Sequence, residues 1–554
     1  MPKHTARILV VLAFVFAATV GWGCQKQAGT GGTTSETPVK GGKFVYGTME
    51  EPDTLNPYIS QLLESVNVSN LFLDGLTRVD EKMKVIPVLA EEVPTTENGG
   101  VSEDGKTITY RLRKGVKWSD GKPFTSADVA FTQSVMMNPK VNVSNRSGYD
   151  KVTKVDTPDE STVIFHLKEP FAPFVNSCFQ YGILPKHALE KSKDLNKDPW
   201  NRTLNPGLGP FTLKTWKQGQ FIEGERNKTY YGGQAYLDNV IVKFVTDPNA
   251  LFAQLKSGEI DWFEFAPATL SKNIKALPNV TLHESDTLSF ENYSLVMKPG
   301  SPLKDVKVRQ AISHAINVAQ IVKTLYPGET QAATTQHPLS WAFNADLKPY
   351  TYDPAEAKKL LDEAGWKDAN NDGIREKGGK RLFLIISTTA GQSDREQKEE
   401  VIVQDLKKVG IGAEVKNYDP PTFFGAFTDG GTLTSGKCDI GIFTNVAGVD
   451  PDNWTLFNSA NIPSSTNPGG QNTGRINDPQ INKLTSEGQV ELDQTKRAEI
   501  YKEIDKIILE KAYTVLERWW KNYDGVNKRV HNAKPNPTSQ GNLWNPMELW
   551  VSGK

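Results

Sequence analysis

A chain of 554 residues cannot be built around a single hydrophobic core. Single cores stop growing at about 250–300 residues, and longer chains divide into separate lobes or domains. The sequence is 38% hydrophobic and 23% charged, which is typical of a globular protein in water. We therefore expect two or more lobes, each with its own core.

The balance of charge argues against a nucleic-acid partner. The formal net charge is -1 at pH 7, and the body of the chain has no cluster of Lys and Arg. Nucleic acids and anionic membrane surfaces are bound through such clusters. Behind the first apolar run, no stretch is long and apolar enough to span a bilayer.

The N-terminus has the pattern of an export signal. Two basic residues precede an apolar run at 8–20, which is short for a bilayer span but matches the apolar part of a signal peptide. Cys24 follows, and the Gly/Thr/Ser-rich tract behind it cannot bury apolar surface and stays flexible. The pattern resembles a bacterial lipoprotein leader, in which residues 1–23 are removed and Cys24 becomes the lipidated N-terminus. An ordinary secretory leader is the alternative, because Gly21 stands where lipoproteins usually have Leu.

Strand and helix patterns alternate along the chain, which predicts a mixed α/β fold. Residues 106–113 and 161–170 alternate apolar and polar side chains, as half-buried strands of one sheet do. Between them, Thr125 and Asp128 form a capping-box pattern that predicts the start of a helix. Further helices are predicted at 306–328, as two helices with Asn317 capping the second, at 354–364 behind Asp353, and at 494–512 with Ile500, Ile504, Ile507 and Ile508 on one stripe.

Two stretches come close to ligand-binding loops. Residues 430–438, GGTLTSGKC, approach a phosphate-binding loop, but Cys438 stands in the Mg²⁺-binding position and a strand pattern follows where a helix is required. Residues 368–379 approach a calcium loop, but Gly379 replaces the final bidentate Glu. We therefore interpret the first as no nucleotide site and the second as a tight turn.

Patterns for metal or covalent chemistry are missing from the sequence. The seven His residues are scattered and form neither HExxH nor a Cys/His zinc spacing. No GxSxG motif occurs, and no Cys/His signature surrounds Cys178 or Cys438. These two cysteines could pair in an oxidising compartment, but we interpret them as small buried residues. We expect binding rather than catalysis, with no metal and no cofactor.

Six segments occur in an order that resembles one family. They are GTMEEPDTLNPY at 47–58, the stretch from LAEEV to DVAF at 89–131, NPGLGPFTLKTW at 205–216, the stretch from NKTYY to EIDW at 227–262, PLKDVKVRQAISHAIN at 302–317, and YDPAEAKKLLDEAGW at 352–366. Together they resemble the extracellular solute-binding proteins of ABC importers that take up oligopeptides, dipeptides or nickel, often called family 5. The resemblance extends from Gly41 to the C-terminus.

The resemblance implies an α/β fold of the two-lobed periplasmic-binding-protein type (type II, the large peptide-binding-protein class). Ligand would be enclosed between lobes that are joined by hinge strands. The expected parts are a flexible linker at 24–42, a first lobe at 43–285 with an extra subdomain at about 62–170, a second lobe at 286–513, and a return to the first lobe at 514–554, with crossings near 283–290 and 513–519.

The implied function is that of a monomeric substrate-binding lipoprotein. It would capture peptides or peptide-like solutes outside the cytoplasmic membrane and deliver them to the permease and ATPase subunits of an ABC importer. Lipid on Cys24 would be its only attachment to the membrane. A non-peptide solute, such as an oligosaccharide, an opine-like metabolite or a metal chelate, is the alternative ligand.

The implied site lacks the acidic residue that the family's peptide binders use. In the family's peptide binders, an Asp about three residues before an acidic-x-Pro or Asp-Pro turn pairs with the peptide's α-ammonium. Here that position is Ala447 or Gly448, and Asp450, Glu50 or Glu51 would have to supply the charge. Trp454, Trp519 and Trp520 are either cleft walls or core residues. The expected ligand-binding residues are Met49, Glu50, Glu51, Thr444, Asn445, Val446, Ala447, Asp450 and Trp454.

Overall fold

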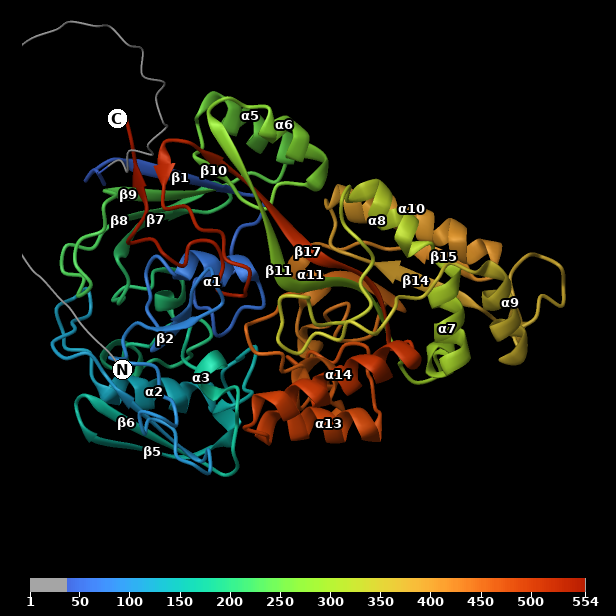
Figure 1. The fold of residues 1–554 in the computed structure, drawn as a ribbon, viewed down its shortest axis with the longest axis horizontal. Helices are drawn as coiled ribbons and strands as arrows, with labels where there is room; N and C mark the ends of the chain where they lie inside the picture. Colours follow the sequence, from blue (N-terminus) through green and yellow to red (C-terminus); the bar gives the residue numbers. More distant parts are fainter. Residues whose placement is uncertain (1–36, 554) are drawn as a thin grey trace, which may run out of the picture. The chain divides into compact units, whose positions relative to one another are not determined.

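The computed structural model of the protein describes residues 37–553 (Figure 1). The predicted signal peptide, the predicted lipidation site Cys24 and most of the predicted linker lie outside the described residues. Within the described part, strands and helices are mixed throughout, which confirms the α/β fold class.

Two long strands cross the centre of a ten-stranded sheet in the described part of the chain, whose order is β15-β14-β16-β11-β17-β10-β1-β9-β8-β7. They are β11 (Val280–Leu295) and β17 (Thr514–Asn527). The two strands pair antiparallel, from Val280 opposite Asn527 onwards, with register shifts near the middle of β11. Figure 1 shows this pair running from the part of the molecule that holds β1, β8 and β9 to the part that holds β14 and β15.

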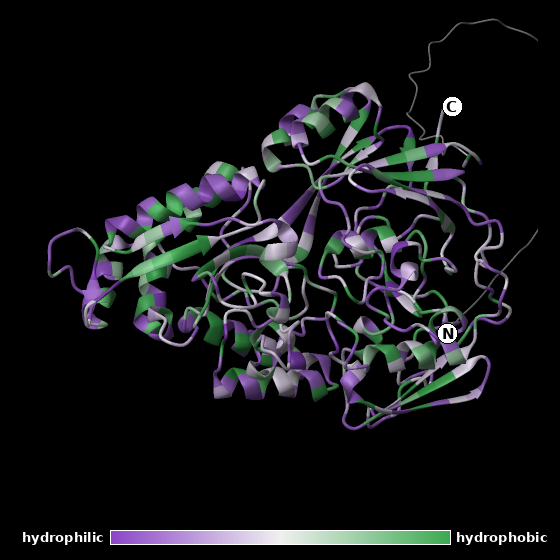
Figure 2. Ribbon diagram, turned by 180° about the vertical axis from the view of Figure 1, so that it is seen from behind, coloured by the Kyte–Doolittle hydropathy of each residue, from purple (hydrophilic) through white to green (hydrophobic). Residues whose placement is uncertain are grey.

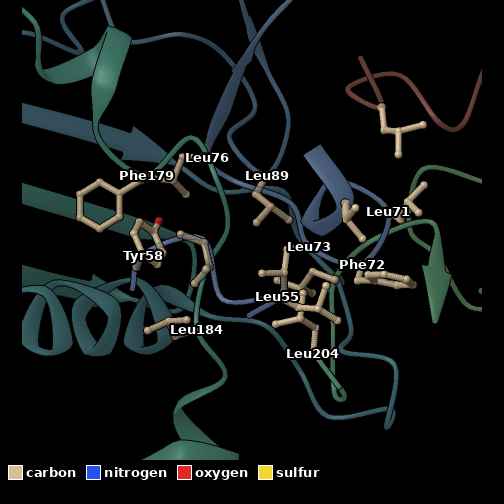
Figure 3. Close-up of a cluster of buried hydrophobic side chains, with 14 of the residues drawn as sticks. Leu55, Tyr58, Leu71, Phe72, Leu73, Leu76, Leu89, Phe179, Leu184 and Leu204 are labelled. Carbon is tan, nitrogen blue, oxygen red and sulfur yellow. The ribbon is translucent and has the colours of Figure 1, made fainter. Parts of the chain in front are cut away.

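The part on one side of the pair has a core drawn from both ends of the chain. This first core contains Phe44, Phe72, Phe165 and Val551. Figure 3 shows some of its side chains clustered together, among them Leu55, Leu71, Phe72, Leu73, Leu76, Leu89 and Leu204. Its sheet strands are β1 (Lys43–Thr48), β7 (Phe211–Lys217), β8 (Phe221–Arg226), β9 (Asn239–Phe244) and β10 (Trp262–Phe263).

Shorter elements surround these strands. They are α1 (Leu63–Ser69), β2 (Thr77–Val79), β3 (Val85–Pro87), α3 (Phe174–Ser177), α4 (Lys186–Leu189), α5 (Pro248–Ser257), α6 (Ser271–Lys275), β18 (Val530–His531) and β19 (Trp550–Val551). Single turns of 3-10 helix occur at η1 (Tyr149–Lys151), η2 (Pro199–Arg202), η3 (Ala268–Leu270), η4 (Pro302–Lys304), η5 (Phe427–Asp429) and η6 (Ser459–Asn461).

A separate three-stranded sheet confirms the strand predictions around residue 110. It contains β4 (Thr107–Arg111), β6 (Thr162–Leu167) and β5 (Val152–Asp159), in that order. The predicted capping box opens α2 (Ser126–Met136), because Thr125 accepts from the backbone of the first turn and Asp128 accepts from the Thr125 amide.

The second core lies on the other side of the long pair and contains Tyr293, Ile312, Ile386 and Ile507. Its helices carry a hydrophobic and a hydrophilic face in Figure 2. Its elements are α7 (Val306–Ala315), α8 (Val318–Leu325), α9 (Pro354–Glu363), β12 (Glu376–Lys377), β13 (Lys380–Arg381), β14 (Phe383–Ser387), α10 (Ser393–Lys408), β15 (Gly412–Val415), α11 (Pro420–Phe424), β16 (Ile440–Asn445), α12 (Trp454–Phe457), α13 (Pro479–Val490) and α14 (Gln494–Glu510).

The helix predictions for this part are confirmed by their caps. Asp353 accepts hydrogen bonds from two backbone amides at the start of α9, and Asn317 accepts one at the start of α8. Helix α14 buries Ile504, Ile507 and Ile508.

The interpretations of the two near-motifs also hold. The residues behind Cys438 form strand β16, so no helix N-terminus is present to bind phosphate. Asp368 accepts from the amides of Asp372 and Gly373, as in a tight turn. Cys178 and Cys438 are both buried and unpaired, and they belong to different hydrophobic clusters. Among residues 37–553, no helix has the length and apolar character of a membrane span.

We expect truncation of a central aromatic residue to destabilise the first core strongly. Phe165 is fully buried, and its ring lies 4.9 Å from that of Phe179 and 5.3 Å from that of Phe174. Phe165→Ala should lower the free energy of unfolding by about 3–5 kcal/mol. Phe383→Ala is the matched control, because Phe383 is 47% exposed. Urea unfolding followed by circular dichroism measures both, and equal losses would contradict this account.

Candidate functional site

Two adjoining cavities lie where the long strand pair passes between the two cores. Their volumes are about 330 Å³ and about 400 Å³. Both are lined by residues 61–63, which lead into α1 on one side, and by Asn445 and Val446 at the end of β16 on the other. The cavities therefore form one cleft, with walls that come from parts of the chain far apart in sequence.

Strand β11 separates the two cavities. Leu288 and Phe290 line the smaller cavity, whereas Thr287 and Ser289 line the larger one. Successive side chains of a strand point to opposite faces, so the two cavities lie on opposite faces of β11. The register of β11 against β17 shifts between Asp286 and Phe290, which is the stretch that borders the cleft. A shift of this kind bends a strand locally.

The structure places most of the predicted ligand-binding residues at this cleft. Met49, Glu50 and Thr444 line the larger cavity, Ala447 and Asp450 line the smaller one, and Asn445 and Val446 line both. Glu51 and Trp454 line neither of them.

Glu51 points away from the cleft. Its carboxylate accepts hydrogen bonds from Trp216 Nε1 at 2.8 Å and from the Gly219 amide at 2.9 Å, at the turn between β7 and β8. Of the three tryptophans considered from the sequence, Trp520 lines the larger cavity. Trp519 donates to the Thr334 carbonyl and packs beside His337, outside both cavities.

Asp450 is already neutralised within the protein. Its two carboxylate oxygens accept from Arg497 Nη1 and Nη2 at 2.9 and 2.7 Å, and both side chains are at most 6% exposed. This bidentate pair leaves Asp450 no uncompensated charge for a ligand. Ala447 contributes main-chain contacts, since its amide donates to Ser289 Oγ and its carbonyl accepts from the Ser539 amide.

Asp452 is a site residue that the sequence reasoning missed. It lines the smaller cavity, accepts from Gln489 Nε2 at 2.9 Å and from the Trp454 amide at 3.0 Å, and forms no ion pair with a described Lys or Arg. Burial, with a smaller contribution from Asp450, raises the pKa of Asp452 to about 6. The signal was present in the sequence as the second acidic residue of Asp450-Pro451-Asp452.

The first-core wall of the larger cavity is acidic. The Glu50 side chain has neither an ion pair nor a hydrogen bond among the described residues, and burial raises its pKa to about 7 although Arg395 favours the charged form. Glu64 and Glu264 line the same cavity and are 3% and 1% exposed. The two carboxyl groups hydrogen-bond to each other, and Asn67 Nδ2 donates to Glu264 Oε1 at 2.9 Å. Burial raises the pKa of Glu64 to about 7 and that of Glu264 well above its ordinary value.

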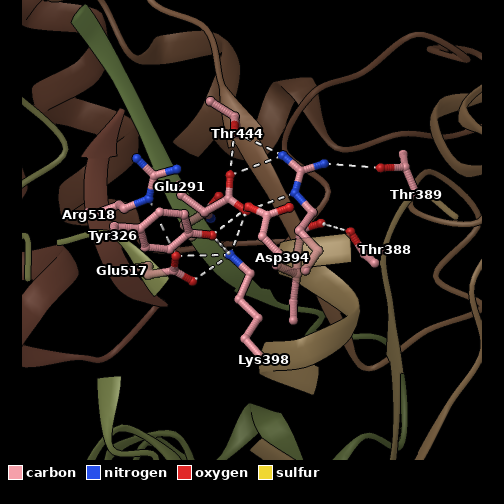
Figure 4. Close-up of polar contacts among 12 residues, drawn as sticks. Glu291, Tyr326, Thr388, Thr389, Asp394, Lys398, Thr444, Glu517 and Arg518 are labelled. Carbon is pink, nitrogen blue, oxygen red and sulfur yellow. Dashed lines mark hydrogen bonds and ion pairs between the residues drawn. The ribbon is translucent and has the colours of Figure 1, made fainter. Parts of the chain in front are cut away.

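A buried ion network forms the second-core wall (Figure 4). Glu291 of β11 accepts from Arg395 Nε at 2.9 Å and from Lys398 Nζ at 2.9 Å, and Thr444 Oγ1 donates to it as well. Lys398 also contacts Glu517 of β17 at 2.8 Å. Burial opposes charge here, but Arg395 and Lys398 hold the pKa of Glu291 well below its ordinary value. The network fastens α10 to both long strands beside the cleft.

Comparisons with known proteins agree on one family. The family model described as "Bacterial extracellular solute-binding proteins, family 5 Middle" matches residues 84–467. The oligopeptide-binding protein AppA of Bacillus subtilis (strain 168) is 31% identical over 562 residues, covering 98% of this chain and 98% of AppA.

Solved structures show the same likeness. The structure of AppA from Bacillus subtilis in complex with a nonapeptide has a TM-score of 0.85 at 30% identity, covering 93% of this chain and 100% of that one. The structure of NikZ from Campylobacter jejuni in complex with Ni(L-His) has a TM-score of 0.82 at 27% identity, covering 92% of this chain and 99% of that one. These likenesses confirm the expected two-lobed fold.

Removing the central cation of the ion network should destabilise the protein strongly. Lys398 is fully buried between Glu291 and Glu517, which are also fully buried. Lys398→Met should lower the free energy of unfolding by about 3–5 kcal/mol, because it leaves two carboxylates short of a counter-charge. The matched control is Lys407→Met, an exposed position on the same helix. If thermal and urea unfolding show the same small loss for both, the network does not stabilise the fold.

The acidic wall should make stability depend on pH. Because the folded pKa of Glu64 is about 7, the folded state holds a proton that the unfolded chain releases near pH 4.3. Stability from this group is therefore fully present below the unfolded pKa and is lost as pH rises through about 7. Glu64→Gln should gain roughly 2–4 kcal/mol relative to the parent between pH 5 and pH 8.

Urea unfolding of the ligand-free protein at several pH values measures this difference. Glu103→Gln, at an exposed position, controls for the loss of one formal charge. A difference between Glu64→Gln and the parent that does not change with pH would refute the prediction.

Proposed function

The chain belongs to the bacterial extracellular solute-binding proteins of family 5, and from this premise we propose that it captures peptides or peptide-like solutes for an ABC importer. The cleft carries the proposal. Besides the charged residues described above, its two cavities are bounded by apolar side chains, by neutral polar side chains such as Gln61 and Asn445, and by main-chain groups such as those at Ala447. Such a lining suits the alternating amide groups and side chains of a peptide.

The relatives support a peptide as the ligand. AppA, which matches this chain over nearly its whole length, is an oligopeptide-binding protein whose solved structure holds a nonapeptide. We propose a cycle of capture, closure of the two lobes over the ligand, and release, without turnover of the ligand. The bend of β11 between Asp286 and Phe290 is the proposed hinge, with the lobes divided at 43–285, 286–513 and 514–554.

We place the protein outside the cytoplasmic membrane, as a monomer held by lipid on Cys24. The leader pattern supports the anchor, and the Gly/Thr/Ser-rich tract behind Cys24 would act as a flexible tether between the membrane and the lobes. The permease and ATPase subunits of the importer are the proposed partners, with which the closed, loaded form would dock.

A non-peptide solute is the second candidate ligand. It is favoured by the lack of charge at Ala447 and Gly448, together with the internal pairing of Asp450 with Arg497. A structural relative, NikZ, holds Ni(L-His) rather than a peptide.

Mass spectrometry of the solute released on denaturing the purified protein tests the proposal. A ladder of short peptides supports peptide capture, whereas a single non-peptide species supports the second candidate. Sustained hydrolysis of added peptides by the pure protein would contradict both.

Filling the middle of the cleft should block binding without harming the fold. Val446 is 46% exposed and lines both cavities, so Val446→Trp should weaken peptide affinity by at least about 10-fold while leaving the melting temperature unchanged. Val415→Trp is the matched control, because Val415 is 40% exposed and lines neither cavity. Calorimetric titration with peptides measures both, and an unchanged affinity in the Val446 variant would place the ligand elsewhere.

A further inference from the structure

The cations that line the cleft are all paired within the protein. No Lys or Arg lines the smaller cavity. In the larger cavity, Arg395 pairs with Glu291 at 2.9 Å, Arg518 pairs with Glu329 at 2.8 Å, and Lys521 pairs with Asp286 at 3.3 Å. The cleft therefore offers no free positive charge to a ligand within the described residues.

In contrast to these paired cations, Asp452 in the smaller cavity is a charged group without an ion-pair partner among the described residues. Its charged neighbours are Asp450 and Arg497, and Arg497 donates hydrogen bonds to both carboxylate oxygens of Asp450. The other titratable neighbour, Tyr501, accepts a hydrogen bond from Arg497. Asp452 keeps two neutral donors and no cation. Its charge is thus compensated only in part.

Polar side chains without hydrogen-bond partners line the same cavity as Asp452. Both amide atoms of Asn453 lack a hydrogen-bond partner although the residue is 3% exposed, and Gln180 Nε2 lacks one at 6% exposure. Both residues line the same cavity as Asp452. Buried polar atoms are nearly always paired, so their exceptions point to a group that completes them.

In the larger cavity, Glu50 is likewise a carboxylate without an ion-pair partner among the described residues. The charged groups that face it are Arg395, which is bound to Glu291, and Asp53, which accepts from Ser60 and Ser65 hydroxyls. The Glu50 carboxylate itself has no partner among the described residues. Behind it lie the buried carboxyl groups of Glu64 and Glu264, which hydrogen-bond to each other. Asp394, the other carboxylate that lines this cavity, accepts from the Tyr326 hydroxyl at 2.6 Å.

We propose that the cleft selects positively charged ligands, and that Asp452 in the smaller cavity and Glu50 in the larger cavity each bind a cationic group. Given the proposed function, on which this inference rests, the preferred substrates are basic peptides, whose α-ammonium and Lys or Arg side chains supply the two charges. A carboxylate removed from water gains most from a cation that enters the same desolvated space.

The ionisation of the two carboxylates agrees with this role. Burial raises the pKa of Glu50 to about 7, although Arg395 favours its charged form, and burial together with Asp450 raises the pKa of Asp452 to about 6. A proton and a ligand cation then compete for each carboxylate. Affinity for a basic peptide should fall as pH is lowered from 8 to 5.5, while affinity for a neutral peptide with a blocked N-terminus should change little.

Calorimetric titration with matched pentapeptides tests the proposal. The protein is unfolded to remove bound solute, refolded, and titrated with penta-alanine and with versions carrying a central lysine or a central glutamate. The lysine peptide should bind at least about 10-fold more tightly than penta-alanine, and the glutamate peptide more weakly. N-acetylation of the lysine peptide should remove part of its affinity.

Three variants assign the effect to residues. Glu50→Gln and Asp452→Asn should each reduce the preference for the lysine peptide to within about 3-fold, or abolish the effect of N-acetylation, and should lower affinity for blocked penta-alanine by a smaller factor. Glu51→Gln is the matched control, since Glu51 is next to Glu50 in sequence but accepts hydrogen bonds from Trp216 and Gly219, away from the cleft. Equal affinity for all three peptides, or equal losses for charged and blocked peptides in the variants, would overturn the proposal.

Failure of the proposed function gives a different result. If no pentapeptide binds, the peptide proposal fails. The charge of the solute released from the native protein then tests whether the cleft selects positively charged ligands. A cationic solute supports it, and a neutral or anionic solute overturns it.

Discussion

The antiparallel pairing of β11 with β17 is the constraint on which the rest of the structure depends. Both strands extend through the boundary between the two cores, so each core completes its sheet with one part of the same pair. The cleft lies at the middle of this pair, where the register shifts and where β11 presents alternate side chains to the two cavities. One pair of strands thus supports both cores and lines the cleft, and it also contains the proposed hinge.

The buried ions beside the cleft reinforce this arrangement. Glu291 and Glu517 come from the two long strands and contact Lys398 of α10, so one fully buried cation joins three elements. Buried pairs of this kind add little to stability compared with a well-packed apolar core, but they fix the relative positions of their members because each charge needs its partner. Arg395 and Thr444 both donate to Glu291, so these donors are already used within the protein.

Local features were predictable from the sequence, whereas long-range pairings were not. The caps at Thr125, Asn317 and Asp353 depend on residues within one helical turn, so a short stretch of sequence is enough to identify them. The family resemblance added the two-lobed fold, and most of the ligand-binding residues that it implied line the cleft. The pairing of Asp450 with Arg497 and the turning of Glu51 toward Trp216 depend on residues distant in sequence, and no local pattern announces them. Asp452 became visible as the uncompensated acid only once the partner of Asp450 was known.

The distance in sequence between the two long strands has a consequence for how the protein folds. Roughly 200–250 residues separate the paired positions of β11 and β17, and most of the second core lies between them. Closing so large a loop costs chain entropy before any contact in the pair repays it. We therefore expect the helices and strands of the second core to assemble early and to bring the two ends together, so that the strand pair at the cleft forms late. The region that binds ligand would then be the slowest part of the molecule to mature.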